Sequence, residues 1–453
     1  MSLAGPPPIS TNPFLRLAED IRRERRARVA FPPGETSLNL RRTRRFASEP
    51  LQVLLESYER FGPVFTLRLF YGRVVWMLGP EANHHMTVSH AADFSWREGH
   101  MGDLIPLLGD GLLTIDGEFH RRSRKIMLPA FHHERIGALH GLMTDEVDAA
   151  IASWRPGTDL DLYAWTRRLA LRIALRALFG VDPERAAGRL DAAEQFERAL
   201  GFWGRAYILQ VLRGPATPWA RMQRARRELD RLIFAEIRRR RTSGERGEDI
   251  LSLLLDAADE EGNTLSEQHI RDEVMTLLFA GHDTTTSTVT FLFHELARAP
   301  EWADRAAAHA ADLELCLDET LRLFPPAWVG PRRSLLDFEF AGQSVPAGAF
   351  VNYSSWASHR LPDVWDAPGA FDPQRFAPGR REQIPKGAYI PFGGGSRTCI
   401  GMRFGQQEIR VIAARILRDF RLELLAGHEL KIRQMPTIGP IGGLPVRIRA
   451  AGR

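Results

Sequence analysis

Cys399 is the residue of this chain best suited to bind a metal ion, because it ends the run PFGGGSRTC at residues 391–399. Three consecutive glycines are unfavourable inside a helix or strand, but they let the backbone run close to a flat group. The apolar periodicity of residues 402–420 predicts a helix that begins just after the cysteine. Helix N-terminal N–H groups stabilise an anion, so this position favours a thiolate ligand. Cys316, on an amphipathic helix without nearby glycines, fits the alternative of a buried, inert cysteine.

A carboxyl and a hydroxyl group stand next to each other in the middle of a long predicted helix. Ser266 is a typical N-cap residue, and a helical pattern runs from it to about residue 299, which corresponds to roughly 45–50 Å. Asp283 and Thr284 lie midway, in AGHDTTT (280–286), where glycine and β-branched residues predict a local opening of the helix. Taken alone, the pattern fits either a proton relay or a capped kink with a paired aspartate. His282 is expected to be structural.

Two further pairs of charged residues have helical spacing. Glu319 and Arg322 are three residues apart, and His120 and Arg124 are four apart, so each pair shares one face of a helix. Pro325 ends the helix that carries the first pair. Pairs with this spacing are common on protein surfaces and contribute little there. Each pair is therefore a weak indicator by itself.

The run FGGGSRTCIG at residues 392–401 resembles the heme-binding signature of cytochromes P450. Other motifs follow the order found in that family: the acid–alcohol pair, the Glu-x-x-Arg pair at 319–322, and FDPQRF at 371–376. On this resemblance the chain is identified as a member of the cytochrome P450 family, of the soluble bacterial type. The resemblance implies a mostly α (α+β) fold, with a large helical domain and a minor β-sheet domain.

The resemblance also implies a role for each matching residue. Cys399 is the expected axial iron ligand of heme b (iron protoporphyrin IX), and its thiolate favours O–O cleavage, as is general for this family. Asp283 and Thr284 are expected to deliver the protons that this cleavage requires. The expected contacts to the cofactor are Phe392 and Ala280 against the porphyrin, and His120, Arg124, Arg332 and Arg397 on its propionates. Arg333 adjoins Arg332, and the sequence does not separate the two. Glu319, Arg322 and Arg375 are expected to form a buried ion network that fixes the loop before Cys399.

The implied activity is that of a monooxygenase, which inserts one oxygen atom from O2 into a C–H or C=C bond. A P450-fold peroxygenase or isomerase is an alternative, but such proteins usually lack the acid–alcohol pair that is intact here. A non-catalytic heme-thiolate binding or sensor protein is the alternative from a different class.

Apolar segments predict the substrate class. Residues 92–113 are apolar but interrupted by glycine and proline, which is typical of an adaptable lid over a pocket. Residues 279–280, 327–329 and 438–441 are the other expected lining segments, although ordinary core packing explains each of them equally well. We expect a lipophilic substrate such as a terpenoid, a steroid-like molecule or a fatty acid.

Electrons are expected to come from a separate ferredoxin or flavodoxin with its reductase, since the 54 residues after Cys399 are too few for a redox domain. A positive patch near the heme motifs would suit such an acidic partner. The basic residues expected to form it are Arg121, Arg122, Lys125, Arg403 and Arg410.

Composition and charge predict the domain organisation and the cellular location. Residues 1–45 are expected to be an Arg-rich N-terminal arm, and residues 46–453 a single cytochrome P450 domain with strands at 64–70 and 337–340. The net charge is +5, but no nucleic-acid motif accompanies the arginines, so nucleic-acid binding is not expected. Two cysteines exclude a disulfide framework. The sequence contains no run of 18 apolar residues, so no transmembrane anchor is expected. A cytoplasmic location is expected.

Overall fold

The computed structural model describes residues 6–180, 190–204, 207–258, 262 and 264–451. The chain folds as two compact units, each built from segments that are distant in sequence. The first unit comprises 1–6, 106–317 and 400–453, and the second comprises 7–105 and 318–399. Cys399 is the last residue of the second unit, and the helix that follows it belongs to the first. The prediction of one domain over 46–453 stays a prediction.

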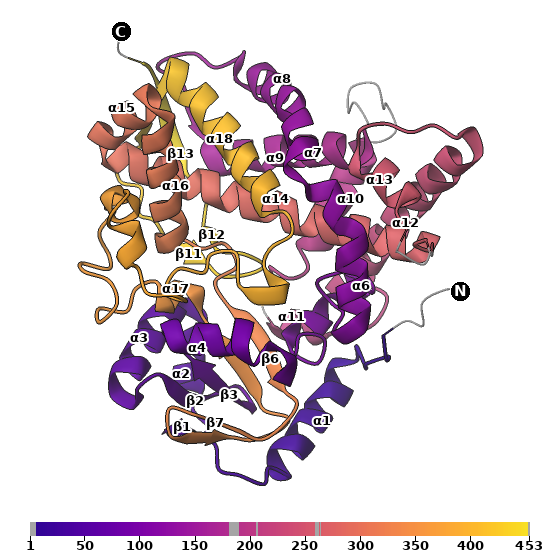
Figure 1. Ribbon diagram of the computed structural model, residues 1–453, viewed down its shortest axis with the longest axis vertical. Coiled ribbons are helices and arrows are strands. Elements are labelled where there is room, and N and C mark those ends of the chain that lie inside the picture. Colours follow the sequence, from indigo (N-terminus) through magenta and orange to yellow (C-terminus); the bar gives the residue numbers. More distant parts are fainter. Residues whose placement is uncertain (1–5, 181–189, 205–206, 259–261, 263, 452–453) are drawn as a thin grey trace. The chain divides into compact units, whose positions relative to one another are not determined.

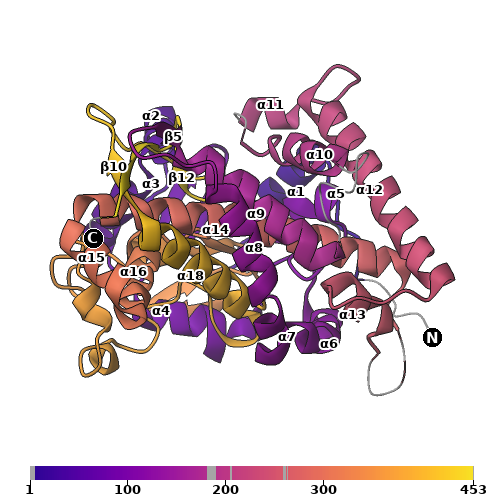
Figure 2. The same cartoon turned by 90° about the horizontal axis from the view of Figure 1, so that it is seen from above.

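The first unit is mainly helical (Figure 1). Its central helix is α14 (Glu267–Arg298), which begins at the predicted N-cap: Ser266 Oγ accepts a hydrogen bond from the His269 N–H at 3.2 Å. Helices α9 and α18 pack along α14, as both views show (Figure 2). The helices of this unit are α6 (Gly117–Met127), α7 (His133–Ala138), α8 (His140–Ile151), α9 (Leu162–Phe179), α10 (Leu190–Leu200), α11 (Tyr207–Val211), α12 (Pro218–Ser243), α13 (Ile250–Asp256), α14, α15 (Pro300–Ala308) and α18 (Met402–Asp419).

Two small sheets complete the first unit. One has the strand order β10-β13-β5, and the other pairs β11 with β12, all antiparallel. The bounds are β5 (Asp159–Asp161), β10 (Phe420–Leu424), β11 (Ile432–Arg433), β12 (Gly439–Pro440) and β13 (Pro445–Ala450).

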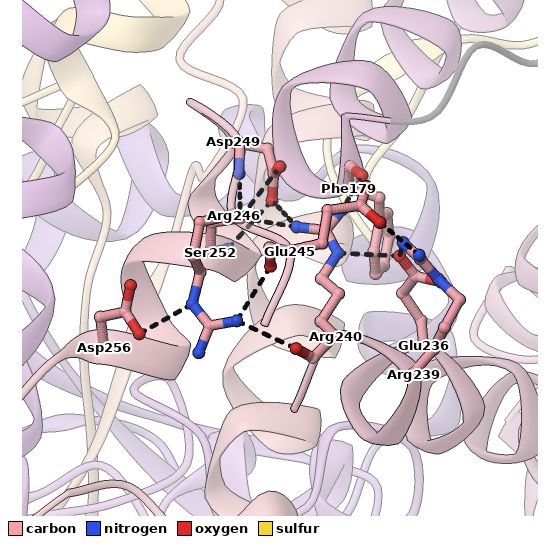
Figure 3. A network of polar contacts seen from close by, with 10 residues as sticks. Phe179, Glu236, Arg239, Arg240, Glu245, Arg246, Asp249, Ser252 and Asp256 are labelled. Carbon is pink, nitrogen blue, oxygen red and sulfur yellow. Dashed lines mark hydrogen bonds and ion pairs between the residues drawn. The ribbon is translucent and has the colours of Figure 1, made fainter. Parts of the chain in front are cut away.

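A buried arginine joins three helices of the first unit (Figure 3). Arg240, near the end of α12, donates to Asp249 at 2.6 Å, to Ser252 at 2.7 Å and to the carbonyl of Phe179 at the end of α9. Glu236, one turn earlier on α12, accepts from Arg240 at 2.8 Å. Because a buried guanidinium must be fully hydrogen-bonded, these contacts fix where α9, α12 and α13 end or begin.

The second unit is built on a six-stranded sheet with the order β1-β2-β3-β9-β6-β4. The predicted strand at 64–70 is confirmed as β2, and the predicted strand at 337–340 is confirmed as β7, in a hairpin with β8. The strands are β1 (Gly34–Glu35), β2 (Val64–Leu69), β3 (Gly72–Met77), β4 (Phe94–Ser95), β6 (Gly330–Ser334), β7 (Phe338–Phe340), β8 (Gln343–Val345) and β9 (Phe350–Tyr353). The helices are α1 (Pro13–Arg25), α2 (Leu40–Ser48), α3 (Pro50–Phe61), α4 (Pro80–His84) and α17 (Ser355–Ser358).

Two helices cross the boundaries between the units, α5 (Ile105–Leu108) and α16 (Ala310–Leu323). Within the described ranges, no helix is both long and apolar enough to span a lipid bilayer.

Candidate functional site

The glycine run before Cys399 folds as a tight loop against a π-helix at His85–Ser89. A side chain on Gly394 would lie 2.6 Å from Thr87 Oγ1, and one on Gly395 would lie 2.0 Å from the Thr87 carbonyl oxygen. Gly395 also has a φ of 60°, which favours glycine. The Cys399 N–H donates to the Phe392 carbonyl at 2.9 Å, which closes the loop. The thiol is exposed, three residues before α18 begins at Met402.

The predicted buried ion network is confirmed within the second unit. Both oxygens of Glu319 accept from Arg322, at 2.7 and 2.8 Å, and Arg375 lies 3.3 Å from the same carboxylate. Glu319 and Arg322 are fully buried, and Arg375 is nearly so. Arg322 also donates to the carbonyls of His359, Pro368 and Ala370, at 2.8 to 3.0 Å.

His359 extends this network to the cysteine loop, and no sequence pattern pointed to this residue. Its Nε2 accepts a hydrogen bond from the Ile390 N–H at 2.9 Å, two residues before Phe392. Burial, aided by the charge of Arg322, lowers the pKa of His359 to about 3, so the ring is neutral and can accept. The chain of contacts therefore runs from Glu319 to the loop that carries the thiol.

Two of the predicted propionate ligands converge on one indole. The Arg332 guanidinium lies 3.8 Å from the centre of the Trp96 ring, and the Arg397 guanidinium lies 5.1 Å from it. Arg333, the next residue on β6, points to the other side of the strand, where it pairs with Asp20 at 2.6 Å and stacks on Phe350. The strand alternation thus separates the two neighbours that the sequence could not separate.

The other predicted propionate ligands lie in the first unit, on α6. His120 is buried and Arg124 is partly buried, four residues further along the same helix face. The predicted spacing on one helix is confirmed, while their role remains a prediction.

Asp283 lies at the centre of a buried polar cluster in the first unit. Its carboxylate pairs with Arg167 of α9, accepts from Thr437 at 2.5 Å, and lies 3.6 Å from Arg433. Burial raises the pKa of Asp283, but Arg167 and Arg433 outweigh it and hold the pKa below its usual value. Arg167 also pairs with Glu197 at 2.8 Å, and Glu197 is partly exposed. The cluster thus connects a buried carboxylate to the surface of the unit.

Thr284 points in a different direction from Asp283. It is only partly buried, and its hydroxyl donates to the Ala280 carbonyl at 2.6 Å, so these two residues share a helix face. Thr286 and Thr290 bond back in the same way at 2.8 and 2.7 Å. The expected local opening is wrong: α14 is continuous, because these hydroxyls add to the helix hydrogen bonds instead of replacing them. His282 is fully buried, with Nε2 3.1 Å from the Arg167 carbonyl, as expected of a structural residue.

Glu408 is a buried acid that the sequence analysis did not single out. It lies on α18, and its Oε2 accepts from Thr285 of α14 at 3.0 Å. Its Oε1 has no hydrogen-bond partner in the part of the chain that the structure describes. Burial raises the pKa of Glu408 to about 8. An acidic residue among the apolar residues on the inner face of this helix was the only available signal.

This raised pKa predicts a pH-dependent stability. Below pH 4.5 the carboxyl is protonated in both folded and unfolded chains, and its stabilising contribution is complete. Between pH 4.5 and about 8 the unfolded chain has lost the proton that the folded chain still holds, so stability falls over this range and the contribution is gone above it. Glu408→Gln should remove on the order of a few kcal/mol of this pH dependence. Urea unfolding between pH 5 and about 9 measures it.

The exposed carboxyl of Glu339 offers a matched control, since Glu339→Gln should leave the pH dependence as in the original protein. Burial also raises the pKa of Glu273 to about 8. Part of the pH dependence of stability should therefore remain in Glu408→Gln. Equal pH dependence in Glu408→Gln and the unchanged protein would rule out a protonated Glu408.

The end of the predicted lid is fastened to α14 within the first unit. The fully buried Arg271 donates to the carbonyls of Leu107 and Leu108 at 3.0 and 3.1 Å. The N–H groups of Asp110 and Leu112 donate to Asp272 and Glu273, at 2.9 and 3.0 Å. Residues 107–112 are therefore held by buried charged groups, and any adaptable part of the lid lies before them.

The side chains present fit a metal ion that receives most of its ligands from a cofactor and few from the protein. Among the described residues, no group of three or more His, Cys, Asp or Glu side chains could hold a metal ion by itself. A single exposed thiol on a glycine loop would suit an iron that a cofactor already holds. The tight backbone at Gly394 and Gly395 and the arginines around Trp96 suit a flat cofactor with carboxylates.

Known proteins of one family resemble this sequence over nearly the whole chain. The family model described as "Cytochrome P450" matches residues 32–310 and 311–442. A relative named putative cytochrome P450 139, from Mycobacterium tuberculosis, is 31% identical over 88% of this chain and 97% of its own length. Cyclooctat-9-en-7-ol 5-monooxygenase from Streptomyces melanosporofaciens is 34% identical over 72% of this chain and 75% of its own.

Solved structures agree in fold. Retinoic acid-bound cyanobacterial CYP120A1 superposes with a TM-score of 0.81 at 28% identity, over 93% of this chain and all of that one. The heme domain of cytochrome P450DA gives a TM-score of 0.84 at 25% identity, over 93% of this chain and 98% of its own. The predicted fold is confirmed, and with it heme b as the cofactor and O2 and a redox partner as the general requirements. The chain belongs to the cytochrome P450 family and is an oxidoreductase of the monooxygenase class.

Proposed function

We propose that this enzyme inserts one oxygen atom from O2 into a lipophilic small molecule, by hydroxylation or epoxidation, and that Cys399 would bind the heme iron through its thiolate. The observation that carries the proposal is the exposed Cys399 thiol, held by a glycine loop three residues before the N-terminus of α18. Bound heme b supplies an iron centre that accepts electrons and activates O2, and a thiolate ligand favours O–O cleavage.

The residues around the thiol would hold the cofactor in place. Phe392 closes the loop through its carbonyl and would lie against the porphyrin, as would Ala280 of α14. Arg332 and Arg397 would bind propionates in the second unit, and His120 and Arg124 would do so in the first. Charge-assisted hydrogen bonds to carboxylates are about twice as strong as neutral ones, which accounts for these residue types.

Asp283 and Thr284 would move protons to the reacting oxygen. The Thr284 hydroxyl, donating to Ala280, keeps its own oxygen free to accept a further hydrogen bond. Asp283 is the buried end of a polar chain that reaches the partly exposed Arg433 and Glu197. Its carboxyl now faces Arg167, so it must turn away from that arginine before it can pass a proton to Thr284. Arg167 would therefore control the relay.

Thr284→Ala tests this part of the mechanism. The variant should consume reductant at a similar rate but release most of the electrons as hydrogen peroxide, because protons no longer reach the oxygen in order. Asp283→Asn should slow product formation by about 100-fold, the lower range for general acid–base catalysis. Product, peroxide and reductant use should be measured together, with a lipophilic compound that shifts the spin state of the iron.

Thr288→Ala is a matched control, since this buried threonine on α14 bonds back to the Thr284 carbonyl at 3.0 Å. It should keep the coupling of the unchanged enzyme. If Thr284→Ala also keeps that coupling, its assigned role is wrong.

A lipophilic substrate is supported by the apolar lining segments and by the relatives. Two Streptomyces melanosporofaciens relatives are named cyclooctat-9-en-7-ol 5-monooxygenase and cyclooctatin synthase, and one structural neighbour has retinoic acid bound. A terpenoid is accordingly the first class of compound to try.

The electron donor would be a separate ferredoxin or flavodoxin with its reductase, in the cytoplasm. The proposed docking patch lies in the first unit, on α6 and α18. Arg403 and Lys125 are exposed there; Arg121 pairs with Glu118, and Arg410 pairs with Glu314. An acidic partner would have to compete with these two carboxylates, which favours a transient complex.

A further inference from the structure

The N-terminal arm has no part in the function proposed above, although it contains many of the arginines of the chain. We propose that residues 7–23 act as a strap that positions the segment 96–104, and that Arg16 and Arg23 thereby control access of small molecules to the heme. The inference rests on the proposed function in one respect, because that function assigns residues 92–113 to the wall of the substrate pocket. All the contacts below lie within the second unit.

Arg16 of α1 makes three of these contacts. Its guanidinium pairs with Asp103, and its Nη2 donates to the carbonyl of Gly99 at 3.0 Å and to that of Glu98 at 3.5 Å. The Arg16 side chain is only 12% exposed, so it lies across the segment and does not extend into solvent. One arginine thus ties down both ends of the short 3-10 helix at His100–Leu104.

Residues of the arm on both sides of Arg16 also contact the segment 96–104. Arg23, two turns later, pairs with Glu98 at 2.5 Å. Before α1, the Pro7 carbonyl accepts a hydrogen bond from Arg97 at 3.0 Å. A side chain on Gly102 would lie 2.6 Å from Ile9 Cδ1, so the arm and the segment are in close contact there. The arm therefore contacts the segment at several points between Arg97 and Asp103.

Asp20 connects the same strap to the sheet. It pairs with the buried Arg333 of β6, and Arg333 donates in turn to the Glu98 carbonyl at 3.0 Å. The neighbouring Arg332 stacks on Trp96, the first residue of the strapped segment. A shift of the arm would therefore move the residues next to the proposed propionate ligands as well as the lid.

Polar groups, not an apolar core, hold the strap in place. No residue of α1 is buried, and Phe14 and Leu15 on this helix are 62% and 60% exposed. The family match begins at residue 32, after this helix. Ion pairs between partly exposed groups are individually weak and are screened by salt. Such a strap can open while the rest of the unit stays folded, which suits control of access.

The experiment uses the heme-loaded enzyme with Arg16→Gln and Arg23→Gln combined. The exposed Arg22 of α1 provides the matched control, Arg22→Gln, which removes the same charge from the same helix. Amide hydrogen exchange reports opening of residues 96–104, and stopped-flow binding of 4-phenylimidazole to the iron reports access. The double variant should show roughly fivefold faster exchange in the segment and faster ligand association. Arg22→Gln should match the unchanged enzyme in both.

Potassium chloride provides a second test without any substitution. Rising salt should speed exchange of residues 96–104 in the unchanged enzyme towards the rate of the double variant, while exchange in α14 stays constant. If exchange of residues 96–104 in the double variant equals that in Arg22→Gln, the strap is overturned. If exchange in the double variant is faster but ligand association is not, control of access by the strap is overturned. Failure of the proposed function is distinguishable, because it would show as the absence of a thiolate–CO band whatever the exchange rates.

Discussion

Cys399→Ala is expected to abolish oxygenation of any substrate and to remove the red-shifted Soret band of the reduced protein with CO. The thiolate is the only protein ligand proposed for the iron, and its electron donation is what favours O–O cleavage. The loop itself should survive, because its geometry depends on Gly394, Gly395 and the Cys399 backbone N–H, which alanine retains. Product assays and CO spectra of the purified variant measure the effect.

Cys316→Ala is the matched control for this variant. Cys316 is a buried cysteine on α16 and should affect only packing. It is expected to keep both the band and the activity. A Cys399→Ala protein that still oxygenates its substrate would show that another residue holds the iron.

The second large effect is expected from Arg322→Ala. Removing one partner from a buried ion network leaves the others without compensation, which typically costs about 3–5 kcal/mol. Here the variant would leave the Glu319 carboxylate buried and would free three backbone carbonyls that Arg322 now binds. Because His359 and Ile390 carry this network to the cysteine loop, heme content should fall together with stability. Urea unfolding and the heme-to-protein ratio measure the two effects.

Arg380→Ala is the comparison, because its pair with Asp372 spans 3.5 Å and the arginine is half exposed. Such surface pairs contribute about 1 kcal/mol or less. Similar losses of stability in the Arg322 and Arg380 variants would mean that the network does not support the loop.

Features set by neighbouring residues were predictable from the sequence. The limits of α14 follow from Ser266 and from the length of the apolar pattern, and α18 begins where the glycine loop ends. The Glu319–Arg322 pair follows from helix spacing. The expected opening of α14 was wrong because propensity cannot tell whether a threonine hydroxyl replaces a helix hydrogen bond or adds to it.

Contacts between residues distant in sequence were not predictable. Arg167 and Thr437, which hold Asp283, are 116 and 154 residues away from it. The contact of Glu408 with Thr285 joins two helices, and His359 reaches the cysteine loop from 31 residues away. No local pattern predicted the partners of the arginines in the N-terminal arm, since only the fold brings Asp103 and Glu98 to them. The functional motifs and their order can be read from the sequence, whereas the polar contacts that position them depend on tertiary structure.

The CO difference spectrum of the dithionite-reduced protein tests the central claim most directly. If Cys399 holds the iron of heme b as a thiolate, the reduced protein with CO should show the strongly red-shifted Soret band that is specific to thiolate–CO adducts. A Soret band at the position given by a nitrogen ligand, or no heme band at all in protein reconstituted with heme, would contradict it.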